Sequence, residues 1–407
     1  MKSKGSTKKA MGNLALLLAA SLFLGSQGFT ILKEDSSTYP QDSGNPQQEM
    51  LPDSNVSENN TRVGAGTPAN PIHHCTMKND GTDYTDFNYV YFGSYPQSEV
   101  TDSATIAAID NAIAISQATA DAGMDVWVNG VKYRRISKND TNYTDYIGYF
   151  EDVLNNGYLG QNLRILNFDD VPNNGYRYFQ WERIKWKVLK NDGNTLFVVA
   201  DRAIDCKDYD EEYKSNIWED SIIRDWLNTS FYNTAFNSSE QGAIVTQDVV
   251  NEDNPKYGTE GGNNTNDNIY LLSISEVTNE TYGFCSYCRT YSMSRRVKVS
   301  DYANARGAWR DISKPYEGNC WWWLRSPGGM SLEAAYVGIY GYIAQGGSYV
   351  EAYDGGICPA LHIDFSSGIW SMVDERTSGE GGNGGENNKG EVSNLSFAGL
   401  QIVLNTV

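Results

Sequence analysis

Hairpin signals are the feature that most restricts how this chain can fold. Asn129-Gly130 separates two short strand-like runs, and Asn-Gly is the dipeptide that a type I′ turn prefers. Asn191-Asp-Gly193 separates a second pair of apolar runs in the same way. Strands joined by such short turns must be antiparallel, because a parallel pair needs a crossover of roughly a dozen residues or more. The chain is therefore expected to build antiparallel sheets.

The rest of the pattern adds a few short helices to these strands. The predicted strands are 88–92, closed by the turn 93–96, and 125–128, 131–134, 184–189, 195–200 and 269–274; the predicted helices are 105–123, 221–228 and 238–244. Antiparallel hairpins beside a few short helices define the α+β class. We expect one domain of this class over residues 75–370.

Both ends of the chain differ from this central part. Residues 1–28 have the three parts of a secretory signal peptide: a lysine-rich start, an apolar run and small residues before a cleavage site. The apolar run is shorter than the roughly 20 residues that a membrane span needs, and no cysteine precedes Cys75 for a lipid anchor. Residues 29–74 are a polar spacer, and 371–407 are a Gly-rich linker and tail. We therefore expect a secreted or cell-surface protein with no transmembrane span in its mature chain.

The charge and the aromatic content limit the kinds of partner. The formal net charge is −19 at pH 7, so the chain repels phosphate backbones, and nucleic acid is excluded as a partner. The chain nevertheless holds 10 Trp, 27 Tyr and 13 Phe residues, which a disordered chain would lack. A packed core is therefore expected.

The six cysteines are expected to form structural disulfides, because the protein is expected outside the cell. Cys285-Ser-Tyr-Cys288 also has the spacing of half a zinc site or of a redox pair, but a second CxxC motif is missing. His73-His74-Cys75 is the other ligand-like cluster. We predict no metal and no cofactor. The disulfide candidates are Cys285, Cys288, Cys320 and Cys358.

Residues 321–328 read WWWLRSPG, which is the most unusual stretch of the chain. We interpret Trp322, Trp323 and Arg325, together with Pro359 further on, as scaffold: the indoles are buried, and the guanidinium pairs with a carboxylate. The alternative is that one exposed tryptophan of this stretch forms a stacking platform for a sugar.

Residues 330–354 alternate at period two and predict an amphipathic hairpin. The small and β-branched residues of the inner face are Ala335, Val337, Ile339, Val350 and Ala352; the residues of the outer face include Tyr336, Tyr340, Tyr342, Tyr349, Glu351 and Tyr353. Residues 345–348 (QGGS) are expected to form the turn. Tyrosine rings give a large contact area at low entropy cost, so the outer face predicts ligand binding. An ordinary aromatic-rich strand pair is the alternative.

Several short motifs together resemble an uncharacterised domain that is common in secreted proteins of anaerobic bacteria. The motifs are FGSYPQ (92–97), IKWKVL (184–189), WLN (226–228), FY (231–232), WWLRSPG (322–328) and PALHI (359–363). The resemblance covers about residues 85–365. The end of that domain is similar to the variable proteins of diversity-generating retroelements, which have a C-type-lectin-like fold of the formylglycine-generating-enzyme subtype.

The resemblance implies that the segment between the LRSPG and PAL motifs is a ligand-facing variable region. In such proteins, mutation at template adenines turns Asn codons into Tyr, Ser, Asp, Gly, Ala and Ile codons. Those residues dominate 331–354, which contain no Asn. The codons of Glu333, Gln345 and Glu351 do not arise from an Asn codon in this way and need a different template codon. The family usually has Arg before PAL; the Cys358 of this chain suggests a bond to Cys320 instead. The catalytic cysteines of the enzyme have no match, so oxidase activity is not implied.

The leading hypothesis is a binding protein whose hairpin contacts a protein or glycan on another cell or surface, and we do not expect an enzyme. The candidate ligand-binding residues are Ser331, Glu333, Tyr336, Tyr340, Tyr342, Gln345, Ser348, Tyr349, Glu351, Tyr353 and Asp354. The alternatives are a structural surface protein without a defined ligand, and a secreted hydrolase. The hydrolase would use the acidic run with Asp201, Asp205, Asp208 and Glu211 for acid/base chemistry, although that run also suits a solvated loop.

Overall fold

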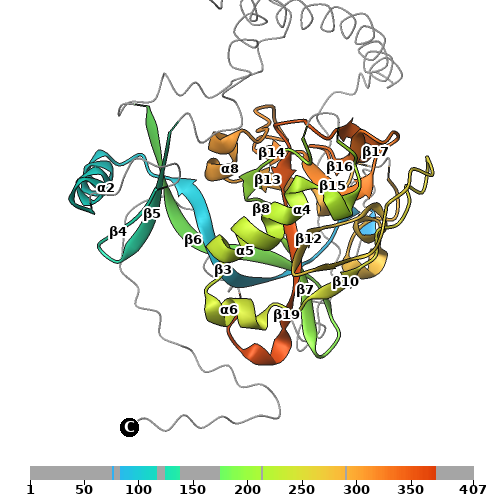
Figure 1. Ribbon diagram of the computed structural model, residues 1–407, viewed down its shortest axis with the longest axis horizontal. Coiled ribbons are helices and arrows are strands. Elements are labelled where there is room, and N and C mark those ends of the chain that lie inside the picture. Colours follow the sequence, from blue (N-terminus) through green and yellow to red (C-terminus); the bar gives the residue numbers. More distant parts are fainter. Residues whose placement is uncertain are drawn as a thin grey trace, which may run out of the picture. The chain divides into compact units, whose positions relative to one another are not determined.

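The computed structural model describes residues 76–77, 83–116, 124–137, 175–211, 214–288 and 291–372 (Figure 1). These residues form a mixed α+β structure with mainly antiparallel strands and a few short helices, as expected. Within them, no helix is both long and apolar enough to cross a membrane. The predicted signal peptide, the spacer, most of the C-terminal tail and the end of the predicted helix 105–123 lie outside the described residues.

The largest sheet has eight strands and contains the two hairpins predicted around residues 129–130 and 191–193. Its order is β12 (Ile269–Leu271), β19 (Pro359–Asp364), β7 (Thr195–Ala200), β6 (Tyr176–Asn191), β3 (Asn88–Glu99) and β20 (Ser371–Met372), with β5 (Val131–Ser137) paired to β6 and β4 (Met124–Val128) paired to β5. Asn129 and Gly130 both have positive φ, at 51° and 80°, as a type I′ turn requires. The predicted turn at 93–96 is wrong. The pairing of β3 with β6 shifts register next to Gly93 and Gln97, and β3 continues through these bulges to Glu99.

Two smaller sheets complete the strand structure. A five-stranded sheet has the order β17 (Ile343–Tyr349), β16 (Glu333–Val337), β15 (Trp322–Pro327), β18 (Gly356–Ile357) and β9 (Asp205–Cys206). A three-stranded sheet has the order β14 (Asn319–Cys320), β13 (Val297–Val299) and β8 (Arg202–Ala203). Two strand pairs stand apart: β1 (Thr76–Met77) with β2 (Asp83–Tyr84), and β10 (Gln247–Val249) with β11 (Thr265–Asp267).

The helices are short, and side-chain caps mark where several of them begin. They are α2 (Ser103–Ser116), α4 (Ile222–Trp226), the π-helical turn η4 (Leu227–Phe231), α5 (Tyr232–Ala235), α6 (Ser238–Ala243), α7 (Ile274–Val277) and α8 (Asp301–Arg306), with single 3₁₀ turns η3 (Trp218–Asp220), η5 (Glu280–Tyr282), η6 (Met293–Arg295) and η7 (Phe365–Ser367). Ser221 caps α4, and Asn237 with Glu240 forms a capping box on α6. Both helices were predicted near these positions.

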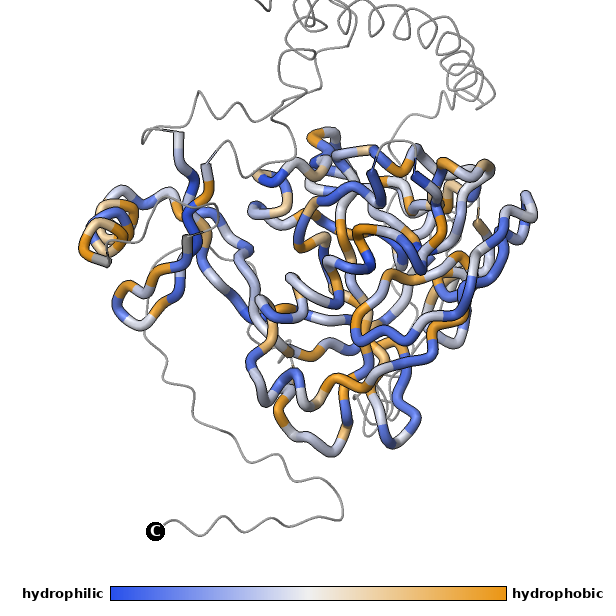
Figure 2. The backbone as a smooth tube through the Cα atoms, in the orientation of Figure 1, coloured by the Kyte–Doolittle hydropathy of each residue, from blue (hydrophilic) through white to orange (hydrophobic). Residues whose placement is uncertain are grey.

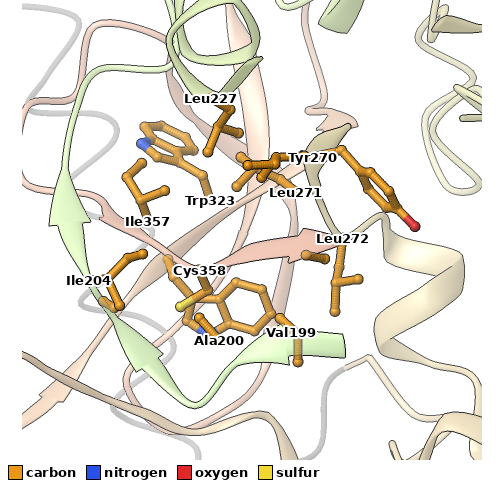
Figure 3. Packing of buried hydrophobic residues seen from close by; sticks show 14 of the residues in the cluster. Val199, Ala200, Ile204, Leu227, Tyr270, Leu271, Leu272, Trp323, Ile357 and Cys358 are labelled. Carbon is orange, nitrogen blue, oxygen red and sulfur yellow. The ribbon is translucent and has the colours of Figure 1, made fainter. Parts of the chain in front are cut away.

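A large hydrophobic core joins the eight-stranded and five-stranded sheets. Figure 3 shows part of it, in which Trp323, Ile357 and Leu227 come from β15, β18 and η4. Burial of each large side chain of this kind contributes roughly 1.5–3 kcal/mol. A separate small cluster packs α2 against the β4–β5 hairpin and β6. The loop between β10 and β11 is hydrophilic almost throughout in Figure 2.

The predicted scaffold residues are part of this core. Trp322 and Trp323 are 2% and 0% exposed. The Arg325 guanidinium forms an ion pair with Glu276 and also donates to the Leu271 carbonyl at 2.8 Å. Pro359 begins β19. The interpretation of this motif as buried scaffold with a paired arginine is therefore confirmed.

Of the four disulfide candidates, Cys285 is disulfide-bonded, whereas the other three are corrected by the structure. Cys288, Cys320 and Cys358 are free thiols, so no disulfide joins Cys285 to Cys288 or Cys320 to Cys358. Cys320 and Cys358 are both fully buried in the apolar core, and burial raises the pKa of each thiol. A buried free cysteine packs as a small hydrophobic residue, which accounts for both positions.

Candidate ligand-binding face

The predicted hairpin exists as β16 and β17, which pair antiparallel from Glu333–Tyr349 to Val337–Ile343. Its turn lies at residues 338–342, so the predicted turn at 345–348 is wrong. The Gly338 amide donates to the Tyr342 carbonyl at 2.9 Å, and the Gly341 amide donates back to the Gly338 carbonyl at 2.7 Å. Gly341 has a φ of 82°, which glycine adopts without strain.

Residues 345–347 form a bulge within β17 in place of a turn. Ala334 pairs with Ser348 and Tyr336 with Ala344, so β17 carries extra residues between the two pairs. The buried Asn254 amide donates to the Gln345 carbonyl at 2.8 Å and to the Pro327 carbonyl at 2.7 Å. This side chain from the loop after β10 therefore fixes the bulge to the end of β15.

One side of the hairpin is packed firmly against the protein, as predicted. Ala335, Val337 and Val350 are fully buried, and so is Ala334, which neighbours the bulge. The predicted inner residues Ile339 and Ala352 are half-buried. This burial gives the hairpin a rigid base.

The tyrosines on the other side are organised in ring clusters, and most of them are half-buried. Tyr336 lies with its ring centroid 5.1 Å from that of Trp321 and 6.4 Å from that of Tyr342, both in edge-on contact. Burial raises the pKa of Tyr336 above its usual value. Trp321 is itself only half-buried, whereas the two tryptophans after it are buried. An aromatic surface made of three rings therefore lies beside the hairpin.

A second ring cluster is centred on the tip of the hairpin. The ring of Tyr340 lies 4.4 Å from that of Tyr316 and 5.3 Å from that of Tyr291. Arg296 donates to the Tyr340 carbonyl at 3.2 Å, and its guanidinium lies 5.0 Å from the Tyr316 ring centroid. The tip is therefore positioned by residues from two other segments.

The remaining candidate residues vary in exposure along the hairpin. Tyr349 is 54% exposed at the end of β17, and Ser331 is exposed before β16. The half-buried candidates are Glu333, Gln345, Ser348, Glu351, Tyr353 and Asp354. The exposed apolar side chains of Tyr257 and Met330 lie near the same end, since Tyr257 approaches Gly346 and Met330 precedes β16.

A carboxylate group lies beside the aromatic surface. The Asp354 side chain accepts a hydrogen bond from Trp321, and burial raises the Asp354 pKa to about 6, with a contribution from the charge of Asp208. Burial likewise raises the pKa of Asp208 to about 6, and the nearby Glu351 raises it further, against Lys207, which lowers it. The structure therefore brings Asp208 of the predicted acidic run to the hairpin.

These two raised pKa values predict how stability depends on pH. The folded state binds these protons more tightly than the unfolded chain, whose aspartate pKa is about 3.9, so the free energy of unfolding falls as the pH rises from about 4 to about 6. Asp354→Asn keeps a hydrogen-bond acceptor and removes the charge. We expect this variant to be about 1–2 kcal/mol more stable than the wild type at pH 7 and equally stable at pH 4. Urea unfolding at both pH values measures this, and an equal difference at the two pH values contradicts it.

The other carboxylates of the acidic run have separate partners. Asp201 pairs with Lys185 and Lys187, each at 3.6 Å, and the buried Asp205 pairs with Arg306 at 3.3 Å. Glu211 is exposed. The four residues that were considered together for acid/base chemistry therefore do not share one set of contacts. In the described part of the chain, no three His, Cys, Asp or Glu side chains form a metal-binding group.

Several residues of this face were not predicted from the sequence. Tyr291 and Tyr316 pack on the tip, Asn254 holds the bulge, and Asp208 joins the carboxylates. All four lie outside the 330–354 window, and no local spacing relates them to it. The tryptophan triplet was the one signal that pointed to an aromatic platform, and Trp321 is its half-exposed member.

A known family model matches part of the chain. A family model described as a domain of unknown function (DUF6273) matches residues 192–365, the segment from the β6–β7 turn to the end of β19. It includes the hairpin, both ring clusters and the carboxylates. No curated protein and no solved structure matches the chain significantly.

Proposed function

We propose that this chain is a secreted or surface-displayed ligand-binding protein and that the β16–β17 hairpin presents its ligand-binding face. In this proposal the domain is C-type-lectin-like, and residues 331–354 are its diversified region. The protein acts by display and not by catalysis. A rigid base holds side chains that contact a protein or glycan on another cell.

The observation that carries the proposal is the half-exposed aromatic surface on a fixed hairpin. The Tyr336 ring contacts both Trp321 and Tyr342 edge to edge, and Tyr349 lies further along with 54% of its surface exposed. Tyrosine and tryptophan are the residues that dominate hot spots at interfaces, and pre-ordered rings lose little entropy on binding. A hairpin that served only as structure would not need this cluster on its outer side.

The carboxylates suggest which ligands the face prefers. Glu351, Asp354 and Asp208 add negative charge beside the rings, so the face favours basic groups of a protein ligand or the hydroxyl groups of a glycan. Ligands with exposed phosphate or sulfate would be repelled from this face.

Removing the half-buried ring of Tyr342 and the exposed ring of Tyr349 should weaken binding without unfolding the protein. In the double variant Tyr342→Ala and Tyr349→Ala, we expect at least a tenfold loss of affinity, since hot-spot tyrosines contribute about 2 kcal/mol or more. The full chain and the variant would be compared on a glycan array and on intact bacterial cells. Trp127→Ala is the matched control, because Trp127 is 67% exposed but lies on β4, in another sheet. Equal capture by a folded double variant would overturn the proposal.

The diversification part of the proposal has its own test. Closely related copies of the gene should differ mainly within codons 331–354, at positions such as Tyr349, and not in the buried inner face. A reverse transcriptase gene and a template repeat should lie beside the gene. Differences spread evenly along the domain would contradict diversification and leave the binding test unaffected.

A further inference from the structure

A hollow that adjoins the hairpin tip at Arg296 has the opposite charge to the rest of the protein. It has a volume of about 300 Å³ and lies among the segment before β3, β8, η6 and β13. Its charged lining residues are Lys187, Asp201, Arg202, Arg296 and Lys298. Four cations therefore face one carboxylate, on a chain whose formal net charge is −19.

The strand register places two of these cations directly side by side. β8 and β13 run parallel, and Arg202 is the Cα partner of Lys298. Residues paired in register project from the same face of a sheet, and like charges in such positions destabilise it. Arg296 directly precedes β13 and also lines the hollow. Three cations therefore line one hollow, and the pairing of Arg202 with Lys298 does not stabilise the sheet.

No carboxylate of the described residues neutralises these three cations. Neither Arg202 nor Lys298 has an ion pair in that part of the chain, and Arg296 bonds a carbonyl and faces the Tyr316 ring. Asp201, the one acid in the lining, is shared between Lys185 and Lys187 at 3.6 Å each. The positive charge of the hollow is therefore available to a ligand.

The walls also offer room for an uncharged part of that ligand. Phe87 and Tyr89 line the hollow beside the cations, and the Lys187 ammonium lies 5.6 Å from the Phe87 ring centroid. A volume of about 300 Å³ is at the lower end for small-molecule pockets. It suits one compact anionic group on a small organic body, and the overall negative charge of the chain repels a polyanion.

We propose that this hollow binds a small molecule that carries a phosphate or sulfate group, such as a phosphate or sulfate ester of a sugar. Arg202 and Lys298 bind its oxygens, and Arg296 adds charge from the hairpin side. Guanidinium and ammonium groups are the usual partners of such oxyanions in proteins. The site differs from the ligand-binding face in the sign of its charge, and the two adjoin at Arg296, which donates to the Tyr340 carbonyl at the hairpin tip.

The test uses the full chain and four sugars that differ at one carbon: glucose 6-phosphate, glucose 6-sulfate, glucuronate and glucose. Isothermal calorimetry at low salt should show binding of the phosphate, the sulfate or both, which distinguishes the two sources of the oxyanion. Glucose should not bind, and glucuronate should bind more weakly than the better ester. The proposal is overturned if neither ester binds more tightly than glucose, or if glucuronate binds best.

Three variants then assign the site. Arg202→Gln and Lys298→Gln should each weaken ester binding at least tenfold, whereas Lys190→Gln, which removes the charge of an exposed lysine elsewhere, should change it less than twofold. Equal weakening by Lys190→Gln would overturn the proposal. Thermal melting is the second readout: the bound ester should raise the Tm of the wild type more than that of the Arg202 and Lys298 variants. Without the ester, both variants should melt no lower than the wild type, because each removes a like-charge contact.

Discussion

Replacing Gly341 with alanine should lower the free energy of unfolding by about 3–5 kcal/mol, which is the largest effect we expect from a single methyl group. A Cβ atom at this position would lie 1.9 Å from the carbonyl oxygen of Ser292. The φ of 82° also places the residue in the left-handed region, which costs an L-residue about 1–2 kcal/mol. The clash involves backbone atoms on both sides, so the hairpin tip must separate from residue 292 or carry the strain.

Gly130→Ala is the matched control, because it separates the clash from the backbone preference. Gly130 has nearly the same φ, at 80°, but an added Cβ there would meet nothing within 4 Å. We expect a loss of only about 1–2 kcal/mol for this variant. Urea unfolding of both variants measures the difference. Equal losses would mean that the contact between the tip and Ser292 contributes nothing.

The sequence predicted the hairpins whose turns are decided locally. In the 129–130 turn, the Asn side chain and the lack of a Cβ atom at Gly by themselves favour the required positive φ values, and no distant residue is needed. The turn of the β16–β17 hairpin was misplaced for the converse reason. Its sequence offers two glycine-containing turns, at 338–341 and at 345–348. The choice between them depends on Ser292, which contacts the tip, and on Asn254, which holds the bulge.

The candidate face could be predicted in part for the same reason. Period-two alternation identified Ala335 and Val337 as inner residues and Tyr349 as an exposed one. The exposure of Tyr336 and Tyr340 could not be derived in this way, because their rings are covered by Trp321, Tyr316 and other residues outside the strand pair. Alternation tells which side of a sheet a residue faces. It does not tell what else lies on that side.

Arg295 is the other residue on which the hairpin tip depends, and replacing it with methionine should cost about 3–5 kcal/mol. Its side chain is fully buried and donates to the carbonyls of Gly341 at 2.7 Å, Cys285 at 2.6 Å and Tyr287 at 2.8 Å. Burial lowers the pKa of this guanidinium to about 10, so it remains charged at neutral pH. Methionine fills similar space but leaves these buried carbonyls without donors.

Two further substitutions show whether the hydrogen bonds carry this effect. Arg295→Lys keeps the charge, but a single ammonium group cannot reach all three carbonyls as the guanidinium does. Its free energy of unfolding should therefore lie between those of the wild type and the methionine variant. Arg183→Met removes an exposed arginine that donates to the Tyr91 carbonyl at 3.0 Å, and it should cost less than about 0.5 kcal/mol.

Hydrogen exchange would separate loss of the tip from loss of the whole fold. The amides of Gly341 and Ile343 are hydrogen-bonded within or near the turn, and the amide of Val198 lies in the central sheet. In Arg295→Met, exchange at Gly341 and Ile343 should be accelerated relative to the wild type more than exchange at Val198. Uniform acceleration at all three would mean that Arg295 stabilises the domain as a whole and does not specifically hold the tip. Faster exchange at the tip alone would show that this arginine fixes the hairpin on which the proposed ligand-binding face is built.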